Sequence, residues 1–298
     1  MVKFDKNEVF LLPADESGRR RMREYVEQRH GFLNVSVVAM SITARPLEVY
    51  RVGNGRSAVA VFAAHHALES ITTNLAFLLI DTLLGFSINE RINGIDCKLL
   101  LSKYSFFILP CVNPDGVELR FHGADNSPLK DRQHRMSCGD FSHWQANARG
   151  VDLNHNYNYR FMEYKRIELE RKILPGCSLY SGEYPESEPE TRGVASLVRA
   201  LSPVAVVSLH SQGEEIYGYP RTRKTERRLA RLAALTGYSP SEADGTAAYG
   251  GLSDYTGSLG IPSFTYEVGK GENPLPEEQV FPIFRRIAES IILLPTLL

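Results

Sequence analysis

A histidine and a glutamate interrupt an apolar run and have the side chains and spacing of metal ligands. His66 and Glu69 follow the run 59–64, which is short, rich in β-branched residues and typical of a strand covered on both faces. Apolar residues then recur at helical spacing through 68–84, so a helix begins where the strand ends. Three residues apart on a helical turn, the imidazole and the carboxylate can bind one ion. Alone, the pair also fits a surface histidine beside a glutamate in the first turn of a helix.

Two further apolar runs end on side chains of the same kinds. The run 204–210 ends on His210, and the run 262–267 ends on Glu267. In open α/β sheets ligands bind at the carboxyl ends of strands, so these side chains are expected to meet the first pair. Two histidines and one glutamate suit a catalytic zinc ion, because three protein ligands leave the fourth position to water. A further glutamate can then accept a proton as the water attacks a carbonyl. We therefore expect one zinc ion per chain, held by His66, Glu69 and His210.

Length and composition predict a single globular domain over residues 1–298. Of these residues 43% are hydrophobic, which is enough for a large core. The net charge of −1 gives no sign of a nucleic-acid surface, and four cysteines without regular spacing indicate free thiols. No apolar run is long enough for a membrane span, and the first residues lack the apolar stretch of an export signal. We expect a cytoplasmic protein without nucleic-acid or membrane partners; the oligomeric state stays open.

Apolar periodicity alternates between strand and helix along the chain, which predicts an α/β fold. Strands are expected at 35–42, 47–52, 59–64, 104–112, 204–210 and 262–267. Helices are expected at 18–29, 68–84, 163–173, 190–201, 223–235 and 278–294. The segment Asn113-Pro-Asp-Gly116 indicates a turn, 121–149 a long irregular functional loop, and 245–260 a glycine-rich loop.

These residues, with four motifs, resemble the zinc carboxypeptidases of the carboxypeptidase A type. Within that family the chain is most similar to the bacterial γ-D-glutamyl-meso-diaminopimelate peptidases. The likeness covers about 35–272 and rests on Asn113-Pro-Asp-Gly116, Gly150-Val-Asp-Leu-Asn154, His210-Ser-Gln-Gly-Glu-Glu-Ile-Tyr217 and Glu267-Val-Gly-Lys-Gly-Glu-Asn-Pro-Leu-Pro276. The resemblance implies a three-layer α/β/α sandwich of the phosphorylase/hydrolase-like kind, on a mixed, roughly eight-stranded sheet. It also implies a hydrolase in which Glu267 is the general base.

The resemblance assigns roles to further residues near the metal. Asp152 matches a carboxylate that hydrogen-bonds a zinc-bound histidine and raises its basicity. Asn154 and His155 stand at the substrate-binding positions of the family, where His155 departs from the pattern. In the digestive enzymes an arginine follows the asparagine, whereas His155 is not a permanent bidentate cation. Arg149 is the candidate for stabilising the oxyanion of the intermediate, with a structural role as the alternative.

Other residues are candidates for contact with the substrate. Tyr249 is the nearest match to the family's mobile active-site tyrosine, and Tyr255 is the next. Ser253 falls where the family sets side-chain specificity, and its small polar side chain argues against a large apolar substrate group. Glu214 closely follows the third metal ligand and could meet a substrate amino group, ordinary solvation being the other interpretation. His65 is expected to face the sheet edge or solvent, because neighbouring residues of an extended chain point in opposite directions.

The leading hypothesis for function is a zinc metallopeptidase that hydrolyses a peptide or γ-glutamyl amide bond, with a small peptide or muropeptide as substrate. One alternative is a zinc amidohydrolase or deacylase of the aspartoacylase type, which shares the ligands and the base. Another is a non-catalytic binding domain on the same fold. Glu267 favours an enzyme, because a decayed site is expected to lose its general base first.

Overall fold

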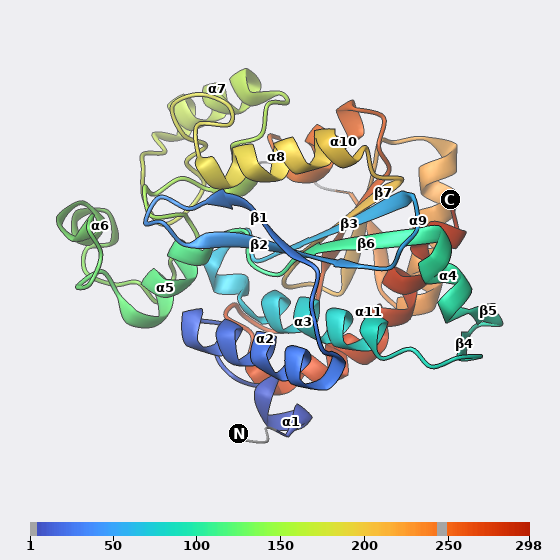
Figure 1. Cartoon of the computed structure of the whole chain (residues 1–298). Helices are drawn as coiled ribbons and strands as arrows, with labels where there is room; N and C mark the ends of the chain where they lie inside the picture. Colours follow the sequence, from blue (N-terminus) through green and yellow to red (C-terminus); the bar gives the residue numbers. More distant parts are fainter. Residues whose placement is uncertain (1–4, 243–248) are drawn as a thin grey trace.

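An eight-stranded mixed sheet runs through the centre of the molecule (Figure 1). The computed structural model describes residues 5–242 and 249–298. In their spatial order, the strands of the sheet are β1 (Val35–Met40), β2 (Pro46–Val52), β6 (Tyr104–Leu109), β3 (Ser57–Ala63), β7 (Ala205–His210), β10 (Ser263–Glu267), β8 (Glu215–Tyr219) and β9 (Ser239–Ser241). A separate two-stranded ribbon consists of β4 (Arg91–Ile92) and β5 (Ile95–Asp96).

The four central strands β6, β3, β7 and β10 are parallel to one another, so their carboxyl ends meet at one edge of the sheet. Their sequences are mostly apolar because helices cover both faces. Every residue of β3 after Ser57 is buried. On the outer sides of this group, β2 pairs antiparallel with β6, and β8 pairs antiparallel with β10. The last residues of β3, β7 and β10 therefore lie on adjacent strands.

Eleven α-helices lie within the described residues. They are α1 (Lys6–Val9), α2 (Glu16–His30), α3 (Ile71–Leu84), α4 (Cys97–Lys103), α5 (Pro114–His122), α6 (Lys130–Ser137), α7 (Phe161–Arg171), α8 (Pro189–Leu201), α9 (Arg223–Thr236), α10 (Leu252–Ser258) and α11 (Val280–Leu293). Short 3-10 turns are η1 (Ala67–Glu69), η2 (Leu153–His155), η4 (Glu277–Gln279) and η5 (Leu294–Thr296). In the described ranges no helix has both the length and the apolar character needed to cross a bilayer.

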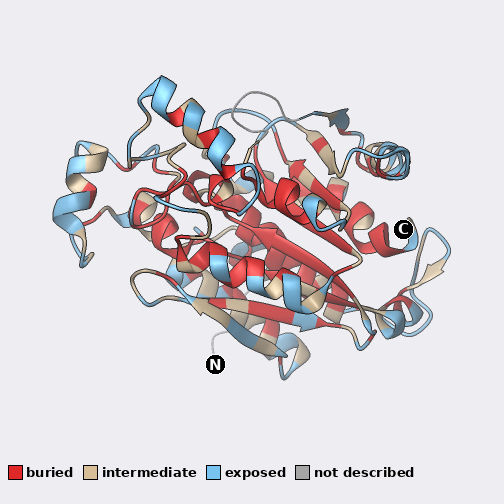
Figure 2. Ribbon diagram, turned by 90° about the horizontal axis from the view of Figure 1, so that it is seen from above, coloured by how far each residue is buried: buried red, intermediate tan, exposed pale blue. Residues whose placement is uncertain are grey.

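The helices form a layer on each face of the sheet. In Figure 1, α8 and α10 lie above the sheet, and α2, α3 and α11 lie below it. Leu75 and Ile287 belong to the apolar core below, and Val194 and Tyr255 belong to the core above. Figure 2 shows that the central strands are buried along their length, whereas the outer helices are exposed on one side. The expected three-layer α/β/α sandwich on a mixed sheet is confirmed.

Two segments expected to be irregular contain helices. The turn sequence at 113–116 begins α5, because Oδ1 of Asn113 accepts the N–H of Gly116 at 2.9 Å and Pro114 occupies the first turn. Within the expected loop 121–149, α6 is a short helix in which only Gln133 is buried. A helix so exposed has no apolar stripe, which is why the periodicity did not reveal it.

The expected glycine-rich loop 245–260 was also only partly right. Residues 243–248 lie outside the described part of the chain, but α10 occupies 252–258 and all of its first five residues are buried. Apolar and polar residues alternate irregularly over so short a helix, so the sequence offered no helical period to detect. The packing of α10 against β7, β8 and β10 decides its conformation instead.

A buried glutamate outside the predicted site gives the fold a dependence on pH. Glu190, in the first turn of α8, is fully buried. Its Oε1 accepts the N–H of Ile42 at 3.4 Å, and Nδ2 of Asn147 lies 3.5 Å from its Oε2. Burial, with a further contribution from the charges of Asp115 and Glu188, raises the pKa of Glu190 to about 8. The folded protein therefore holds a neutral carboxyl group here at neutral pH.

We expect Glu190→Gln to remove part of this pH dependence. Between the ordinary pKa of 4.5 and about 8, the folded state binds a proton that the unfolded state has released, so stability falls as pH rises through this window. Glutamine stays neutral, and the variant should exceed the parent in stability by a few kcal/mol at about pH 9. Urea unfolding at about pH 6 and about pH 9 measures the difference. An equal loss of stability with pH in both proteins would contradict it.

Candidate metal centre

The loop after β3 brings the first two candidate ligands together. β3 ends at Ala63, Ala64 takes a left-handed backbone conformation with a φ of 52°, and η1 follows directly. Within this tight turn the N–H of Glu69 donates to the carbonyl of His66 at 3.1 Å. The side chains also meet, with Nδ1 of His66 lying 2.8 Å from Oε1 of Glu69. The spacing of three residues thus places both donors on one side of the turn.

The backbone of this loop is anchored by the segment after β6. The N–H groups of Val112 and Asn113 donate to the carbonyls of Ala63 and Ala64 at 2.9 and 3.0 Å. Nδ2 of Asn113 donates to the carbonyl of His65 at 3.1 Å. Asn113 was singled out in the sequence only as part of a turn motif. In the structure it fixes the backbone next to the first ligand.

The third candidate ligand comes from the adjacent strand. His210 is the last residue of β7 and is 2% exposed. Its Nδ1 lies 2.8 Å from Oε2 of Glu69, so the two carboxylate oxygens of Glu69 face one imidazole each. Within the described residues these three form the only group of metal-ligating side chains whose ligand atoms all lie within 4.8 Å of one another. The structure thus brings His66, Glu69 and His210 together, and their role as the zinc ligands stays a prediction.

Hydrogen bonds around these side chains suit a zinc ion. Nε2 of His66 faces Oδ1 of Asp152 at 3.1 Å, so this nitrogen carries the proton and Nδ1 keeps its lone pair for a metal. Burial raises the pKa of Asp152, but electrostatic attraction to His66 and His155 and hydrogen bonds from His66 and the N–H of Leu179 hold it below its usual range. Two imidazole nitrogens and a carboxylate oxygen are donors that zinc prefers, and three ligands leave a position for water. The donor set and its support therefore fit zinc.

Glu267 ends the strand next to the one that carries His210. The two residues are paired in the parallel register of β10 and β7, and the N–H of Val268 donates to the carbonyl of His210 at 2.8 Å. Burial raises the pKa of Glu267 to about 7. Across the sheet, β8 places Glu215 opposite Glu267, and the hydroxyl of Tyr217 donates to Glu215 at 3.0 Å.

Arg149 lies in the loop that also carries Asp152. Its side chain is 46% exposed, and its Nη1 lies 3.7 Å from Oε2 of Glu188. Its backbone N–H donates to Oδ1 of Asn147 at 2.9 Å, which fixes the loop. The ion pair with Glu188 fits the structural alternative, and the role of Arg149 at the oxyanion stays a prediction.

Asn154 and His155 lie in η2, directly after Asp152. Oδ1 of Asn154 accepts the N–H of Leu252 at 3.1 Å, which joins η2 to the start of α10. His155 is 6% exposed and stacks on the ring of Tyr164 with centroids 4.1 Å apart. Its Nδ1 donates to the carbonyl of Tyr249 at 2.7 Å. Burial lowers the pKa of His155, so it carries no fixed positive charge at neutral pH.

The remaining predicted substrate contacts lie in different surroundings. Oγ of Ser253 is 2.6 Å from Oγ1 of Thr265, on β10, the strand that ends at Glu267. Glu214 is bound by Lys270 at 3.0 Å and by Arg286 of α11. These cations neutralise the carboxylate of Glu214, which weakens its case as the partner of a substrate amine. The roles of Ser253 and Glu214, and that of Tyr249, remain predictions.

His65 was expected to face the sheet edge or solvent, but it is fully buried. Its Nε2 lies 2.9 Å from the hydroxyl of Tyr157, and its ring stacks on that of His210 with centroids 5.5 Å apart. The positive φ of Ala64 ends the extended backbone before His65, so the alternation rule did not apply. His65 thus supports the ring of a candidate ligand.

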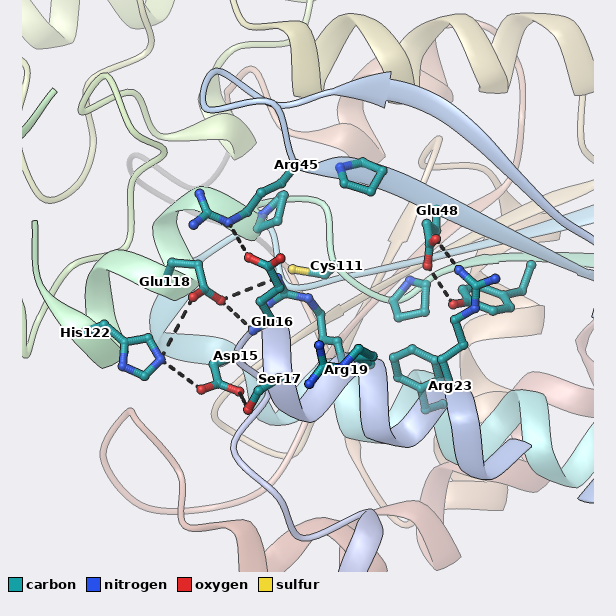
Figure 3. A pocket seen from close by; sticks show the side chains of 16 residues that line it. Asp15, Glu16, Ser17, Arg19, Arg23, Arg45, Glu48, Cys111, Glu118 and His122 are labelled. Carbon is teal, nitrogen blue, oxygen red and sulfur yellow. Dashed lines mark hydrogen bonds and ion pairs between the residues drawn. The ribbon is translucent and has the colours of Figure 1, made fainter. Parts of the chain in front are cut away.

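A cavity of about 550 Å³ lies between α2, β2 and α5, and the candidate metal ligands are not among its lining residues (Figure 3). Its charged side chains pair with one another. Nε of Arg45 donates to Glu16 at 3.0 Å, and Nε2 of His122 lies 2.8 Å from Asp15. Because these charges satisfy one another, the cavity is a poorer candidate for substrate binding than the sheet edge. Cys111 also lines this cavity. It directly precedes Val112 and Asn113, whose N–H groups anchor the loop that carries His66 and Glu69.

Comparison with known proteins agrees with this site. A family model described as zinc carboxypeptidase matches residues 19–290. Gamma-D-glutamyl-L-diamino acid endopeptidase 1 of Lysinibacillus sphaericus is 30% identical over 269 residues, which is 87% of this chain and 66% of that protein. Carboxypeptidase B2 of Homo sapiens is 28% identical over 299 residues, which is 90% of this chain and 66% of that protein. The chain thus spans just under two thirds of the length of these relatives.

Solved structures share the architecture. Thrombin activatable fibrinolysis inhibitor has a TM-score of 0.73 at 21% identity, with 98% of this chain and 78% of that chain covered. Murein-tripeptide amidase MpaA from Escherichia coli O157 has a TM-score of 0.55 at 18% identity, with 87% and 91% covered. At these low identities, the solved structures show that the fold is shared. The match to the family model shows the family. The chain belongs to the zinc carboxypeptidase family.

Proposed function

We propose that this chain is a zinc-dependent peptidase that cleaves the amide bond between a γ-D-glutamyl residue and a diamino acid in peptidoglycan-type stem peptides. The observation that carries the proposal is the meeting of three zinc ligands and a further glutamate at one edge of the sheet. This set supplies the metal ligands and the proton acceptor that metal-assisted hydrolysis of an amide uses.

Glu267 is the residue that moves protons in the proposed reaction. A zinc ion bound by the three ligands supplies Lewis-acid activation of water and of the scissile carbonyl. From the end of the strand next to His210, Glu267 can accept a proton from the attacking water and return it to the leaving nitrogen. Asp152 keeps the proton of His66 on Nε2, away from the metal side of the ring.

Two observations support a polar, charged substrate over an apolar peptide end. The family position for side-chain specificity carries a hydroxyl pair, Ser253 with Thr265, in place of an apolar surface. The position after Asn154 carries a neutral histidine in place of an arginine that would bind a bare α-carboxylate. The relative from Lysinibacillus sphaericus is named for action on a γ-D-glutamyl-L-diamino acid bond, and the structural neighbour MpaA is titled a murein-tripeptide amidase.

The test compares substrates on the zinc-loaded protein. We expect kcat/KM for L-Ala-γ-D-Glu-meso-diaminopimelate to exceed that for hippuryl-Phe and hippuryl-Arg by at least ~10-fold, since one charge-assisted contact is worth ~1.5–3 kcal/mol. N-acetylaspartate tests the deacylase alternative, and protein stripped of metal by a chelator is the control. A preference for either hippuryl substrate would refute the peptidoglycan assignment and leave a general zinc peptidase.

A further inference from the structure

The cavity of Figure 3 combines an apolar floor with a charged rim. Its floor consists of the lining residues that are apolar and buried, which are Tyr50, Phe77, Pro110, Cys111 and Pro114. The volume of about 550 Å³ lies within the range of small-molecule sites. In such sites an apolar wall binds the body of the ligand, and a few polar groups orient it.

The carboxylates of the rim already have close partners. Four of them line the cavity, and each accepts a hydrogen bond from, or faces, a group of the protein. The pairs are Asp15 with His122, Glu16 with Arg45, Glu48 with the hydroxyl of Tyr50, and Glu118 with the N–H of Glu16, all between 2.5 and 3.0 Å. A cationic ligand would have to displace one of these partners.

Two arginines of α2 at the rim keep unused hydrogen-bond donors. Arg20 is exposed, and within residues 5–242 and 249–298 its guanidinium has one ion pair, with Glu24 at 3.8 Å, and no hydrogen bond. Arg19 donates to the carbonyl of Ala14 at 2.7 Å and pairs with Glu118 at 3.5 Å. Because a guanidinium has five N–H donors, both side chains can bind an acceptor from outside the protein. A carboxylate matches this planar group through two parallel hydrogen bonds.

The segment between β6 and α5 lines the cavity and also anchors the loop after β3. This loop, called the metal loop below, carries the first two candidate zinc ligands. The carbonyl of Pro110 accepts the hydroxyl of Thr73 on α3 at 2.7 Å. Directly after Cys111 come the two N–H groups that hold the carbonyls of Ala63 and Ala64. The floor of the cavity and the anchor of the metal loop are therefore consecutive residues of one segment.

Helix α3 links the cavity to the same loop a second time. Phe77 lines the cavity from α3, and Thr72 lies in the first turn of that helix. Oγ1 of Thr72 accepts the N–H of Ala64 at 2.9 Å and donates to the carbonyl of Glu69 at 2.7 Å. A ligand packed against Phe77 and Cys111 thus contacts both elements that hold the metal loop.

We propose that this cavity is a regulatory site for a small organic carboxylate with an aromatic or branched apolar body. The body packs on the floor, and the carboxylate binds Arg19 and Arg20 at the rim. An occupant that restrains α3 and the segment 110–113 raises the free energy needed to open the metal loop. Because zinc also binds only the closed loop, the carboxylate and zinc each raise the affinity of the protein for the other.

The first experiment compares four probes on metal-free protein, so that none can bind a zinc ion. 4-Phenylbutyrate has both parts of the proposed ligand, 4-phenylbutyramide lacks the charge, 4-phenylbutylamine has the opposite charge, and butyrate lacks the ring. Calorimetry should give phenylbutyrate the lowest dissociation constant, by roughly tenfold over each of the others. No binding of phenylbutyrate would overturn the site, and equal binding of the amine would overturn its assignment to an anion.

Variants of α2 test whether the two arginines recognise the charge. Changing Arg19 and Arg20 together to glutamine should weaken phenylbutyrate roughly tenfold and leave the amide unchanged. Arg21→Gln is the matched control, because Arg21 is an exposed residue of the same helix that does not line the cavity. Equal losses for carboxylate and amide, or no loss, would contradict the assignment. If the double variant does not fold, Arg20→Gln at its exposed position decides the question alone.

The thiol on the floor reports where the probe binds. Serine replaces the two exposed cysteines, Cys138 and Cys177, and alkylation by iodoacetamide is followed by mass spectrometry of the peptides. Saturating phenylbutyrate should slow the alkylation of Cys111 at least fivefold. Cys97 is also buried but does not line the cavity, so its rate should stay the same. Unchanged alkylation of Cys111 would show that the probe binds elsewhere and would overturn the site.

Reciprocal affinities test the link to the metal loop. Zinc should lower the dissociation constant of phenylbutyrate at least fivefold, and phenylbutyrate should strengthen zinc binding by the same factor in competition with a chelator. Both effects should disappear in the variant that lacks Arg19 and Arg20. A carboxylate bound to the zinc ion itself would show reciprocity without protection of Cys111, and that pattern would overturn the proposal. Protection of Cys111 without reciprocity would leave a binding site and overturn its regulatory role. None of these measurements uses hydrolysis, so they fail or succeed independently of the proposed function.

Discussion

Replacing His210 by alanine is expected to remove zinc from the protein. Its Nδ1 is one of three ligand atoms and lies against a carboxylate oxygen of Glu69, so the variant keeps only two protein ligands. Zinc affinity should fall by more than ~10², because even the loss of a residue that merely orients a ligand costs 10–100-fold. Competition with a chromogenic chelator measures the affinity, and metal analysis after dialysis measures the stoichiometry.

The matched control for this change is His122→Ala. His122 is 53% exposed at the cavity of Figure 3, faces Asp15, and is not one of the three candidate metal ligands. It should keep one zinc ion per chain. Full zinc occupancy in the His210 variant would show that another set of residues holds the metal.

Replacing Glu267 by glutamine is expected to stop hydrolysis while zinc stays bound. The amide keeps the shape of the side chain but cannot accept a proton from water, and general-base catalysis contributes ~10²–10⁴ in rate. We therefore expect kcat to fall by at least ~10², with zinc content equal to that of the parent. Steady-state kinetics on the best substrate of the panel, together with metal analysis, measure both quantities.

Glu215→Gln is the matched control for the base. Glu215 lies opposite Glu267 in the sheet and accepts a hydrogen bond from Tyr217. The substitution therefore removes a neighbouring carboxylate of the same type as Glu267. Its kcat should stay within a few-fold of the parent. If Glu267→Gln keeps nearly full activity and Glu215→Gln loses it, the general base has been assigned to the wrong carboxylate.

The parts of the site that lie at strand ends could be predicted from the sequence. The runs before His66 and His210 are buried on both faces, and such strands appear in a sequence as nearly continuous apolar residues. The strand before Glu267 is less completely buried and alternates polar Ser263 and Thr265 with aromatic residues. Parallel order then brings their carboxyl ends together without any knowledge of side-chain contacts. The candidate metal ligands could therefore be predicted from local pattern and one topological rule.

Residues whose surroundings depend on distant loops could not be predicted in this way. His65 is buried because the chain turns at Ala64 and the ring stacks on His210, which is 145 positions away in the sequence. The burial of Asp254 on α10 gave no signal, because one aspartate in a glycine-rich segment is ordinary and only tertiary packing buries it. Sequence periodicity reports which face of an element is buried and does not report what a polar side chain meets there.

The loop after β3, which carries His66 and Glu69, is anchored in a way that links the retention of zinc to the solvent exchange of two amide protons. The N–H groups of Val112 and Asn113 are hydrogen-bonded to Ala63 and Ala64, so the backbone before His66 cannot open without exposing them. An ion that binds only the closed loop adds its binding free energy to the free energy of that opening. Slow deuterium uptake at these two amides and slow escape of zinc are therefore two consequences of one local unfolding event.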